Sequence, residues 1–191
     1  MMTELGRPRD KRIDSAVLRA TVELLAQTGY ADLSVDAIAR RAGTSKPAIY
    51  RRWASKAHLV HEAVFPISDM TALPATGSLG GDVREMVNRT AAVLTTPAAR
   101  AALPGLVGEM AADLTLHAAL LERFGDILSR GLTDRLADAV TRGEARPDVT
   151  AAEVVEVVAG TTFLALLTRG DALDDCWVDR TAALITRGIG L

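Results

Sequence analysis

The hydrophobic residues of this chain recur at three- and four-residue spacing over most of its length, which predicts amphipathic helices. The first helix ends at Gly29 and has one apolar face, made of Ile13, Ala16, Val17, Ala20, Leu24 and Leu25. Three shorter helices follow, each opened by a serine N-cap. They extend over Ser34–Gly43, Ser45 to about Trp53, and Ser55–Pro66. Pro47 falls in the first turn of the middle one, where a missing N–H is tolerated.

The second part of the chain predicts at least five more helices. Residues 71–81 (TALPATGSLGG) are rich in Gly, Pro, Ser and Thr, which is typical of a loop between domains. The segments beyond it are Asp82–Leu94, Pro97–Asp113 with a kink at Pro104–Gly105, His117–Arg142, a helix opened by a Thr150–Glu153 capping box and ended near Gly170, and Asp175–Arg187. We therefore expect an all-α fold of about nine helices.

Residues 151–167 (AAEVVEVVAGTTFLALL) are apolar on most of the helix circumference. A helix of this kind must be buried on two sides. We expect its second burial surface to be another subunit, with the last two helices paired with their symmetry copies in a homodimer. The alternative is a central core helix in a monomer.

Composition and charge agree with this organisation. Hydrophobic residues make up 49% of the chain and aromatic residues only 4%, which favours helices over sheets. Residues 1–56 hold 11 Lys and Arg against 6 Asp and Glu, whereas residues 57–191 hold 11 against 18. The two parts carry formal charges of +5 and −7, so the N-terminal part is the expected nucleic-acid-binding end.

The sequence also bears on the cellular location. Cys176 is the only cysteine, which excludes an intramolecular disulfide and suits a reducing compartment. The N-terminus is charged, and no segment reaches the roughly 18 charge-free apolar residues of a membrane span. We expect a cytoplasmic protein that does not interact with membranes.

Residues 34–59 (SVDAIARRAGTSKPAIYRRWASKAHL) are the most specific feature of the chain. Two short capped helices flank a glycine turn, and Ala39, Ala42 and Gly43 keep the corner between them small. The second helix exposes a cluster of polar and cationic side chains, which is the layout of a helix-turn-helix that enters the major groove of DNA. These side chains are Lys46, Tyr50, Arg51 and Arg52.

This stretch resembles the DNA-binding domain of the tetracycline-repressor (TetR) family. The matching positions are Ser34, Ile38–Ala39, Ala42–Gly43, Ser45–Lys46, Tyr50, Trp53 and Lys56–Leu59. The match covers residues from about 10 to 65, and Trp53 stands where the family more often has Phe. We accordingly divide the chain into a three-helix DNA-binding domain over residues 1–56, with a basic arm at 1–12, and a helical ligand-binding and dimerisation domain over 57–191. The fourth helix connects the two.

The resemblance implies a role for each matching residue. Ser34, Tyr50 and Lys56 would contact phosphates, and Trp53 would fill the domain core. The residues expected to face base edges or the flanking backbone are Thr44, Ser45, Lys46, Pro47, Ala48 and Arg51. Arg51 and Arg52 could each either contact a guanine base or only neutralise a phosphate. Arg51 is the better candidate for a guanine contact. The arm Gly6–Arg12 either contacts DNA or is a solvated tail.

The expected function is that of a dimeric one-component transcriptional regulator, and we expect a repressor rather than an activator. It would bind a pseudo-palindromic double-stranded DNA operator and be released by a small apolar ligand, a mechanism inferred from the family. Apolar residues that either line a ligand cavity or simply form core are Met86, Leu106, Met110, Leu120, Phe124, Leu128 and Phe163.

Other chemistry finds little support in the sequence. The histidines His58, His61 and His117 are expected at the surface, and Cys176 is expected to be an ordinary half-buried cysteine, so no metal or cofactor is predicted. The sequence shows no nucleophile–base set or phosphate loop, so an enzyme is not expected. The alternatives are a helical protein-interaction module with a basic, anion-binding end and a small all-α enzyme whose site is not visible.

Overall fold

The computed structural model describes residues 11–66, 75–170 and 173–191, and at residues 121 and 123–130 it describes the backbone only. Within these ranges the regular secondary structure is α-helical, apart from a single β-bridge between Ala145 and Gly190. The expected all-α fold is confirmed. Residues 6–10 of the predicted arm Gly6–Arg12 lie outside the described residues, and Lys11 and Arg12 belong to the first helix.

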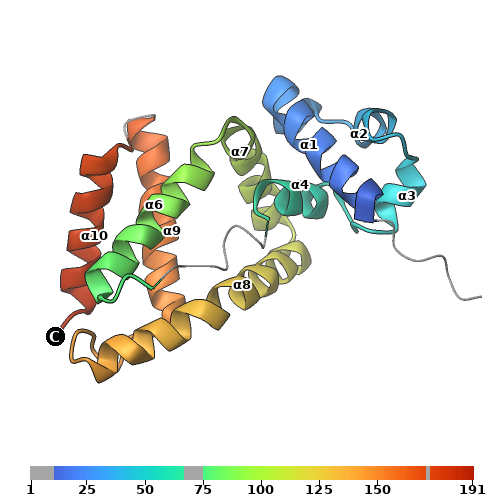
Figure 1. The fold of residues 1–191 in the computed structure, drawn as a ribbon. Helices are drawn as coiled ribbons and strands as arrows, with labels where there is room; N and C mark the ends of the chain where they lie inside the picture. Colours follow the sequence, from blue (N-terminus) through green and yellow to red (C-terminus); the bar gives the residue numbers. More distant parts are fainter. Residues whose placement is uncertain (1–10, 67–74, 171–172) are drawn as a thin grey trace, which may run out of the picture.

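Four helices form the N-terminal end of the molecule: α1 (Lys11–Asp32), α2 (Val35–Arg41), α3 (Lys46–Tyr50) and α4 (Lys56–Val64). They cluster at one end of the structure, with α3 at its extremity (Figure 1). The helical path of α1 is interrupted at Gly29, the predicted helix end, where φ is 74° and ψ is 174°. A positive φ of this kind favours glycine, and the turn carries Tyr30 into the interior.

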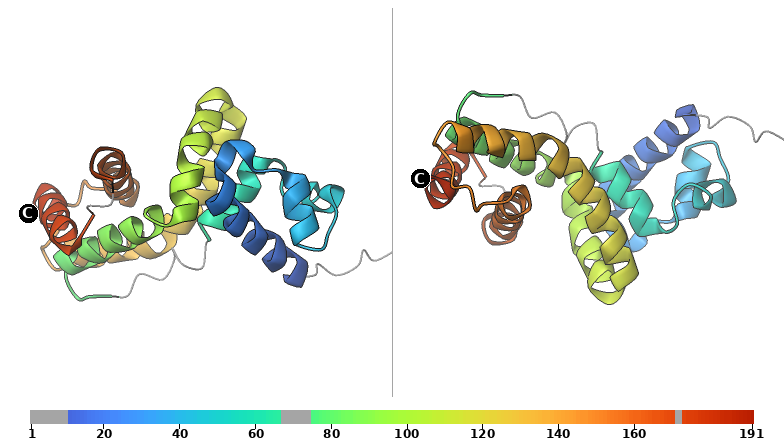
Figure 2. Two further views of the ribbon diagram at one scale, coloured as in Figure 1. Left: turned by 90° about the horizontal axis from the view of Figure 1, so that it is seen from above. Right: turned by 90° about the horizontal axis from the view of Figure 1, so that it is seen from below.

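The remaining helices are α6 (Leu79–Leu94), α7 (Pro97–Ala112), α8 (Leu114–Thr141), α9 (Ala151–Arg169) and α10 (Asp175–Ile189). The helix α6 packs against α9 and α10 at the end of the molecule farthest from α3 (Figure 1). The long helix α8 extends from the N-terminal helices to this group, as the views from above and below show (Figure 2). It contacts α7 and α4 near one end and α9 along its course.

Several predicted boundaries are shifted by local capping. Ser78 accepts a hydrogen bond from the Gly81 N–H and starts α6 at Leu79, so the predicted loop over 71–81 was wrong for its last three residues. Residues 71–74 of that loop lie outside the described residues. Asp113 caps α8 and starts it at Leu114 instead of His117. The helix α7 continues through Pro104 without an interruption.

The buried side chains form two hydrophobic clusters. The first cluster joins α1–α4 to α7, the start of α8 and the end of α9, and the second joins α6, the later part of α8, α9 and α10. In α4, Ala57, Leu59 and Val60 are completely buried in the first cluster. The helices on both sides of Lys56, where we divided the chain, therefore share one core.

Tyr30 connects three helices within the first cluster. A Cβ atom added at Gly105 of α7 would lie 2.1 Å from Cδ1 and 2.4 Å from Cγ of Tyr30, so the ring rests on the backbone of α7. Lys56 Nζ donates to the Tyr30 carbonyl at 3.1 Å and lies 4.3 Å from the ring centroid. Burial, and then the nearby Glu109 carboxylate, raise the pKa of Tyr30 well above its usual range.

The helix α9 has one buried face and one exposed face. The Thr150–Glu153 capping box is present, as predicted. By length and composition alone α9 would suit a membrane span, which is weak evidence because the core helix of a globular protein passes the same test, and 28% of its apolar stretch is buried within the chain. Val154, Val158 and Leu166 are buried, whereas Leu164 and Leu167 are exposed.

The contact between Tyr30 and Gly105 predicts an asymmetry between two glycines of α7. Gly105→Ala should lower the free energy of unfolding by about 1–3 kcal/mol, because the added methyl group overlaps the Tyr30 ring. Gly108→Ala meets open space and should be neutral or stabilise by up to about 1 kcal/mol. Urea denaturation of the two variants measures the difference, and equal effects would contradict the described contact.

Candidate DNA-binding surface

The helices α2 and α3 meet at a tight corner. Gly43 adopts a φ of 66°, and the Thr44 N–H donates to the Ala39 carbonyl at 2.9 Å, which closes the turn. Ile38 and Ala39 of α2 and Ile49 of α3 are buried beneath it. Because these apolar residues fix how α2 and α3 are rotated, Lys46, Pro47 and Tyr50 of α3 face solvent. The predicted helix-turn-helix is present.

The sequence-predicted DNA contacts lie at or near the surface of this corner. Ser34, Ser45, Lys46, Pro47, Tyr50 and Arg51 are exposed, whereas Thr44, Ala48 and Lys56 are partly buried. The Ser45 hydroxyl accepts from the Ala48 N–H at 3.3 Å and therefore serves as the cap of α3. Ser34 occupies the N-cap position of α2, but its side chain makes no capping hydrogen bond. Its hydroxyl is therefore not occupied by its own helix.

The cations of this surface differ in their partners. Lys46 Nζ lies 2.8 Å from Asp36 Oδ2, and this hydrogen bond raises the pKa of Lys46. Arg52 is mostly buried, pairs with Asp14 of α1 and donates to the Ala48 carbonyl. Arg51 is exposed and has no ion-pair partner within the described ranges. Of the two adjacent arginines, the structure leaves Arg51 available to a ligand and uses Arg52 to join α1 to α3.

Trp53 lies in the core of the N-terminal helices, as the resemblance implied. Its side chain is buried, and its indole Nε1 donates to Glu62 Oε2 of α4 at 3.0 Å. A buried indole N–H needs such a partner, and Phe at this position would make no use of Glu62. The larger indole ring of Trp53 is therefore matched by a hydrogen-bond acceptor, Glu62 of α4.

The residues proposed as ligand contacts fall in two places. Leu106 and Leu120 belong to the first hydrophobic cluster, and Met110 and Phe163 pack against it. Met86 belongs to the second cluster. The side chains of Phe124 and Leu128 lie outside the described residues. Four of the seven thus belong to or pack against the first cluster, which also contains α1 and α4, and Met86 lies in the second.

Two expectations about single residues were wrong. His61 is buried rather than at the surface, because α4 directs it into the core, where its ring lies 5.3 Å from that of Phe65. Cys176 is exposed rather than half-buried, because it lies in the first turn of α10 beside the open groove between α9 and α10. Among the described residues, no group of three His, Cys, Asp or Glu side chains is placed to hold a metal ion.

Comparison with known proteins shows the family. Residues 17–63 match the model of the bacterial regulatory proteins of the tetR family, and residues 73–185 match the tetracyclin repressor-like C-terminal domain. The chain belongs to the TetR family of helix-turn-helix transcriptional regulators. Regulators of this family bind DNA operators, typically as dimers, and are not enzymes. The expected class of function is confirmed.

Individual relatives agree with this membership. The chain is 32% identical over 177 residues to the DNA-binding transcriptional repressor TetR of Mycobacteroides abscessus, covering 90% of each protein. It is 29% identical over 182 residues to the HTH-type transcriptional regulator YdeS of Bacillus subtilis, covering 93% of this chain and 90% of YdeS. The crystal structure of the TetR family regulator SCO0332 superimposes with a TM-score of 0.71, at 28% identity, over 93% of this chain and 98% of that one.

The different environments of Arg51 and Arg52 predict different effects on stability. Arg52→Ala removes a partly buried pair with Asp14 and should cost about 1–3 kcal/mol of unfolding free energy. Arg51→Ala removes an exposed side chain and should change it by less than about 0.5 kcal/mol. Thermal denaturation followed by circular dichroism compares the two, and a larger loss for Arg51→Ala would contradict these assignments.

Proposed function

We propose that this regulator is a repressor that binds a pseudo-palindromic operator as a homodimer and is released by a small apolar ligand. The observation that carries the proposal is the outer face of α3, where Lys46, Tyr50 and Arg51 are exposed while Ile49 anchors the helix. A relative named as a repressor, and the fold shared with NalD, described as the secondary repressor of a multidrug efflux pump in Pseudomonas aeruginosa, support it. An operator on chromosomal DNA places the protein in the cytoplasm.

The contacts with DNA divide into two kinds. Ser34, Tyr50 and Lys56 contact phosphates and set the position of the domain, as such contacts generally do. The N-terminal part of α3 faces the base edges in the major groove, with the flanking turn beside it. The residues of this second group are Thr44, Ser45, Lys46, Pro47, Ala48 and Arg51.

The double variant Lys46→Ala/Tyr50→Ala tests this surface. Fluorescence anisotropy with duplexes from the region flanking the protein's own gene should show tight binding by the wild type, with log K falling by about 0.9 per phosphate contact for each unit of log salt. The double variant should lose at least about tenfold in affinity, because it removes one base contact and one phosphate contact.

Arg84→Gln is the matched control, because Arg84 is an exposed cation of α6 at the other end of the molecule (Figure 1). It should bind DNA like the wild type. Weak binding of equal strength to every duplex, unchanged in the double variant, would contradict the proposed DNA surface.

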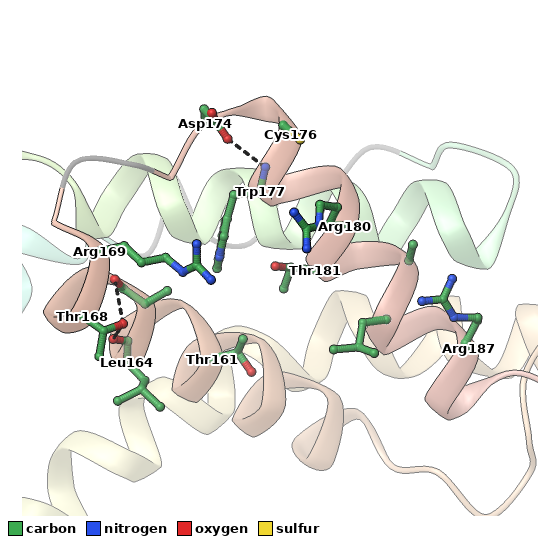
Figure 3. A pocket seen from close by; sticks show the side chains of 13 residues that line it. Thr161, Leu164, Thr168, Arg169, Asp174, Cys176, Trp177, Arg180, Thr181 and Arg187 are labelled. Atoms are coloured by element: carbon green, nitrogen blue, oxygen red, sulfur yellow. Dashed lines mark hydrogen bonds between the residues drawn. The ribbon is translucent and has the colours of Figure 1, made fainter.

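The exposed side of α9 and α10 supports the proposed dimer. A groove of about 800 Å³ lies between these helices, and Leu164 and Leu184 on its walls are 60% and 64% exposed. Trp177 points from α10 toward α9 within the groove, and Arg169, Arg180 and Arg187 lie around it (Figure 3). We call Leu164, Trp177 and Leu184 the apolar strip. An apolar surface with a charged rim is typical of a protein interface. A two-fold copy of the same two helices would cover it and complete a four-helix bundle.

Charged substitutions in this strip should separate the subunits. Leu164→Glu/Leu184→Glu places two carboxylates in the proposed interface and should convert a dimer to a monomer in sedimentation equilibrium at micromolar concentration. Leu114→Glu is the control, since Leu114 is 78% exposed at the start of α8 and lies outside the strip. A wild-type monomer, or a double variant with the mass of the wild type, would contradict the interface.

The ligand is proposed to enter between α7, α8 and α9, which carry Leu106, Met110, Leu120 and Phe163 at the first hydrophobic cluster. These residues are apolar, so they suit a largely apolar compound. They also belong to, or pack against, the cluster that holds α1 and α4, so a ligand that separates them acts on the DNA-binding helices. Release of the labelled duplex on addition of apolar compounds tests this part of the proposal.

A further inference from the structure

The ion pair between Asp36 and Lys46 joins the two helices of the helix-turn-helix. Asp36 lies in the first turn of α2, and Lys46 is the first residue of α3. Lys46 Nζ and Asp36 Oδ2 are 2.8 Å apart, and the two side chains are 46% and 52% exposed. A negative charge therefore lies at the surface that the proposed function brings against the negatively charged DNA.

The fold fixes this placement. Val35 and Ile38, which flank Asp36 along α2, are buried, as is Ile49 of α3. The helix α2 cannot turn Asp36 away from α3 without exposing these residues. Two other carboxylates of α1 pair with different cations, Glu23 with Arg41 and Asp14 with Arg52. Asp36 is thus the carboxylate that controls Lys46.

The pair has different consequences for correct and incorrect DNA sequences. An ammonium group has three N–H donors, so Lys46 can keep Asp36 as one partner and still donate to guanine O6 or N7. A phosphate is attracted by net charge, and while Lys46 stays paired the Asp36 carboxylate offsets the ammonium charge. Strong neutralisation of a phosphate in DNA of any sequence therefore requires Lys46 to leave Asp36, and the unpaired carboxylate then faces the phosphate backbone. The pair therefore lowers sequence-independent binding more than it lowers specific binding.

We propose that Asp36 is a positioning residue for sequence selectivity, which directs Lys46 to a base edge and weakens binding to DNA of other sequences. This inference rests on the proposed DNA-binding surface. It assigns a role in recognition to an acidic residue that makes no attractive contact with the phosphates.

Asp36→Asn tests the role, because it removes the charge and keeps nearly the same shape. The probes are a duplex selected from random-sequence DNA and a scrambled duplex of equal length. For the scrambled duplex, affinity at low salt should rise about three- to tenfold, and the salt dependence should steepen by up to about 0.9, the value for one additional phosphate contact. Affinity for the selected duplex should change less, so the ratio of the two affinities falls.

Asp179→Asn is the matched control. Asp179 is an exposed aspartate that pairs with Arg84 at 2.6 Å, and its helix α10 lies at the opposite end of the molecule from α3 (Figure 1). This variant has the same change in net charge and should leave both affinities and the salt dependence unchanged. An affinity ratio in Asp36→Asn equal to that of Asp179→Asn would overturn the proposal.

A double-variant cycle shows whether Asp36 acts through Lys46. In a Lys46→Met background, Asp36→Asn should no longer steepen the salt dependence, because the cation that it would release is absent. The same increase with and without Lys46 would mean that Asp36 acts by general repulsion, which overturns the positioning role. Equal melting temperatures of all variants exclude a change in folding as the cause.

The outcomes also separate this inference from the proposed function. If the wild type binds the selected and scrambled duplexes equally, the proposed DNA-binding surface itself fails. If the wild type is selective, Lys46→Met loses selectivity and Asp36→Asn keeps it, only the role of Asp36 fails.

Discussion

The contact between the Tyr30 ring and the backbone of α7 at Gly105 determines how the DNA-binding helices are attached to the rest of the chain. Lys56 holds the same tyrosine from α4, through its carbonyl and its ring. The attachment is a shared hydrophobic core and not a flexible linker, since buried residues of α1, α4, α7 and α8 form one cluster. Close-packed interiors transmit displacements between the elements that share them. A change among α7, α8 and α9 therefore reaches α1 and α4 directly, which suits a regulator whose ligand and DNA act on one chain.

At the other end of the molecule, α9 and α10 carry an exposed apolar surface. The helix α9 contributes Val154 and Val158 to the second cluster, and its exposed Leu164 lines the same groove as the exposed Leu184 of α10. An apolar surface of this kind is costly in water unless a partner covers it. A second copy related by a two-fold axis would cover it and would also set two α3 helices at a fixed separation. In the proposed repressor, dimerisation through α9 and α10 thus determines the distance between the two α3 helices.

Features that depend on neighbours along the chain could be predicted from the sequence. The caps Ser45 and Ser55, the capping box at Thr150 and the helix-turn-helix corner at Gly43 all follow from local patterns, and all are present. Features that depend on which helix faces which could not be predicted. The burial of His61, the exposure of Cys176, the Asp36–Lys46 pair and the fit of Tyr30 on Gly105 each require the rotation and crossing of separate helices. The position of Asp36 in the first turn of α2 is visible in the sequence, but an acidic residue there is ordinarily explained by its interaction with the helix dipole alone.

The central claim is that two copies of the chain present their α3 helices to an operator with matching two-fold symmetry. Selection of binding sites from random-sequence DNA by the purified wild-type protein tests this claim most directly. The predicted result is an enriched inverted repeat whose half-sites are centred about 10 base pairs, or a multiple of one helical turn, apart. Enrichment of a single half-site without a repeat, or no enrichment after repeated rounds, would contradict it.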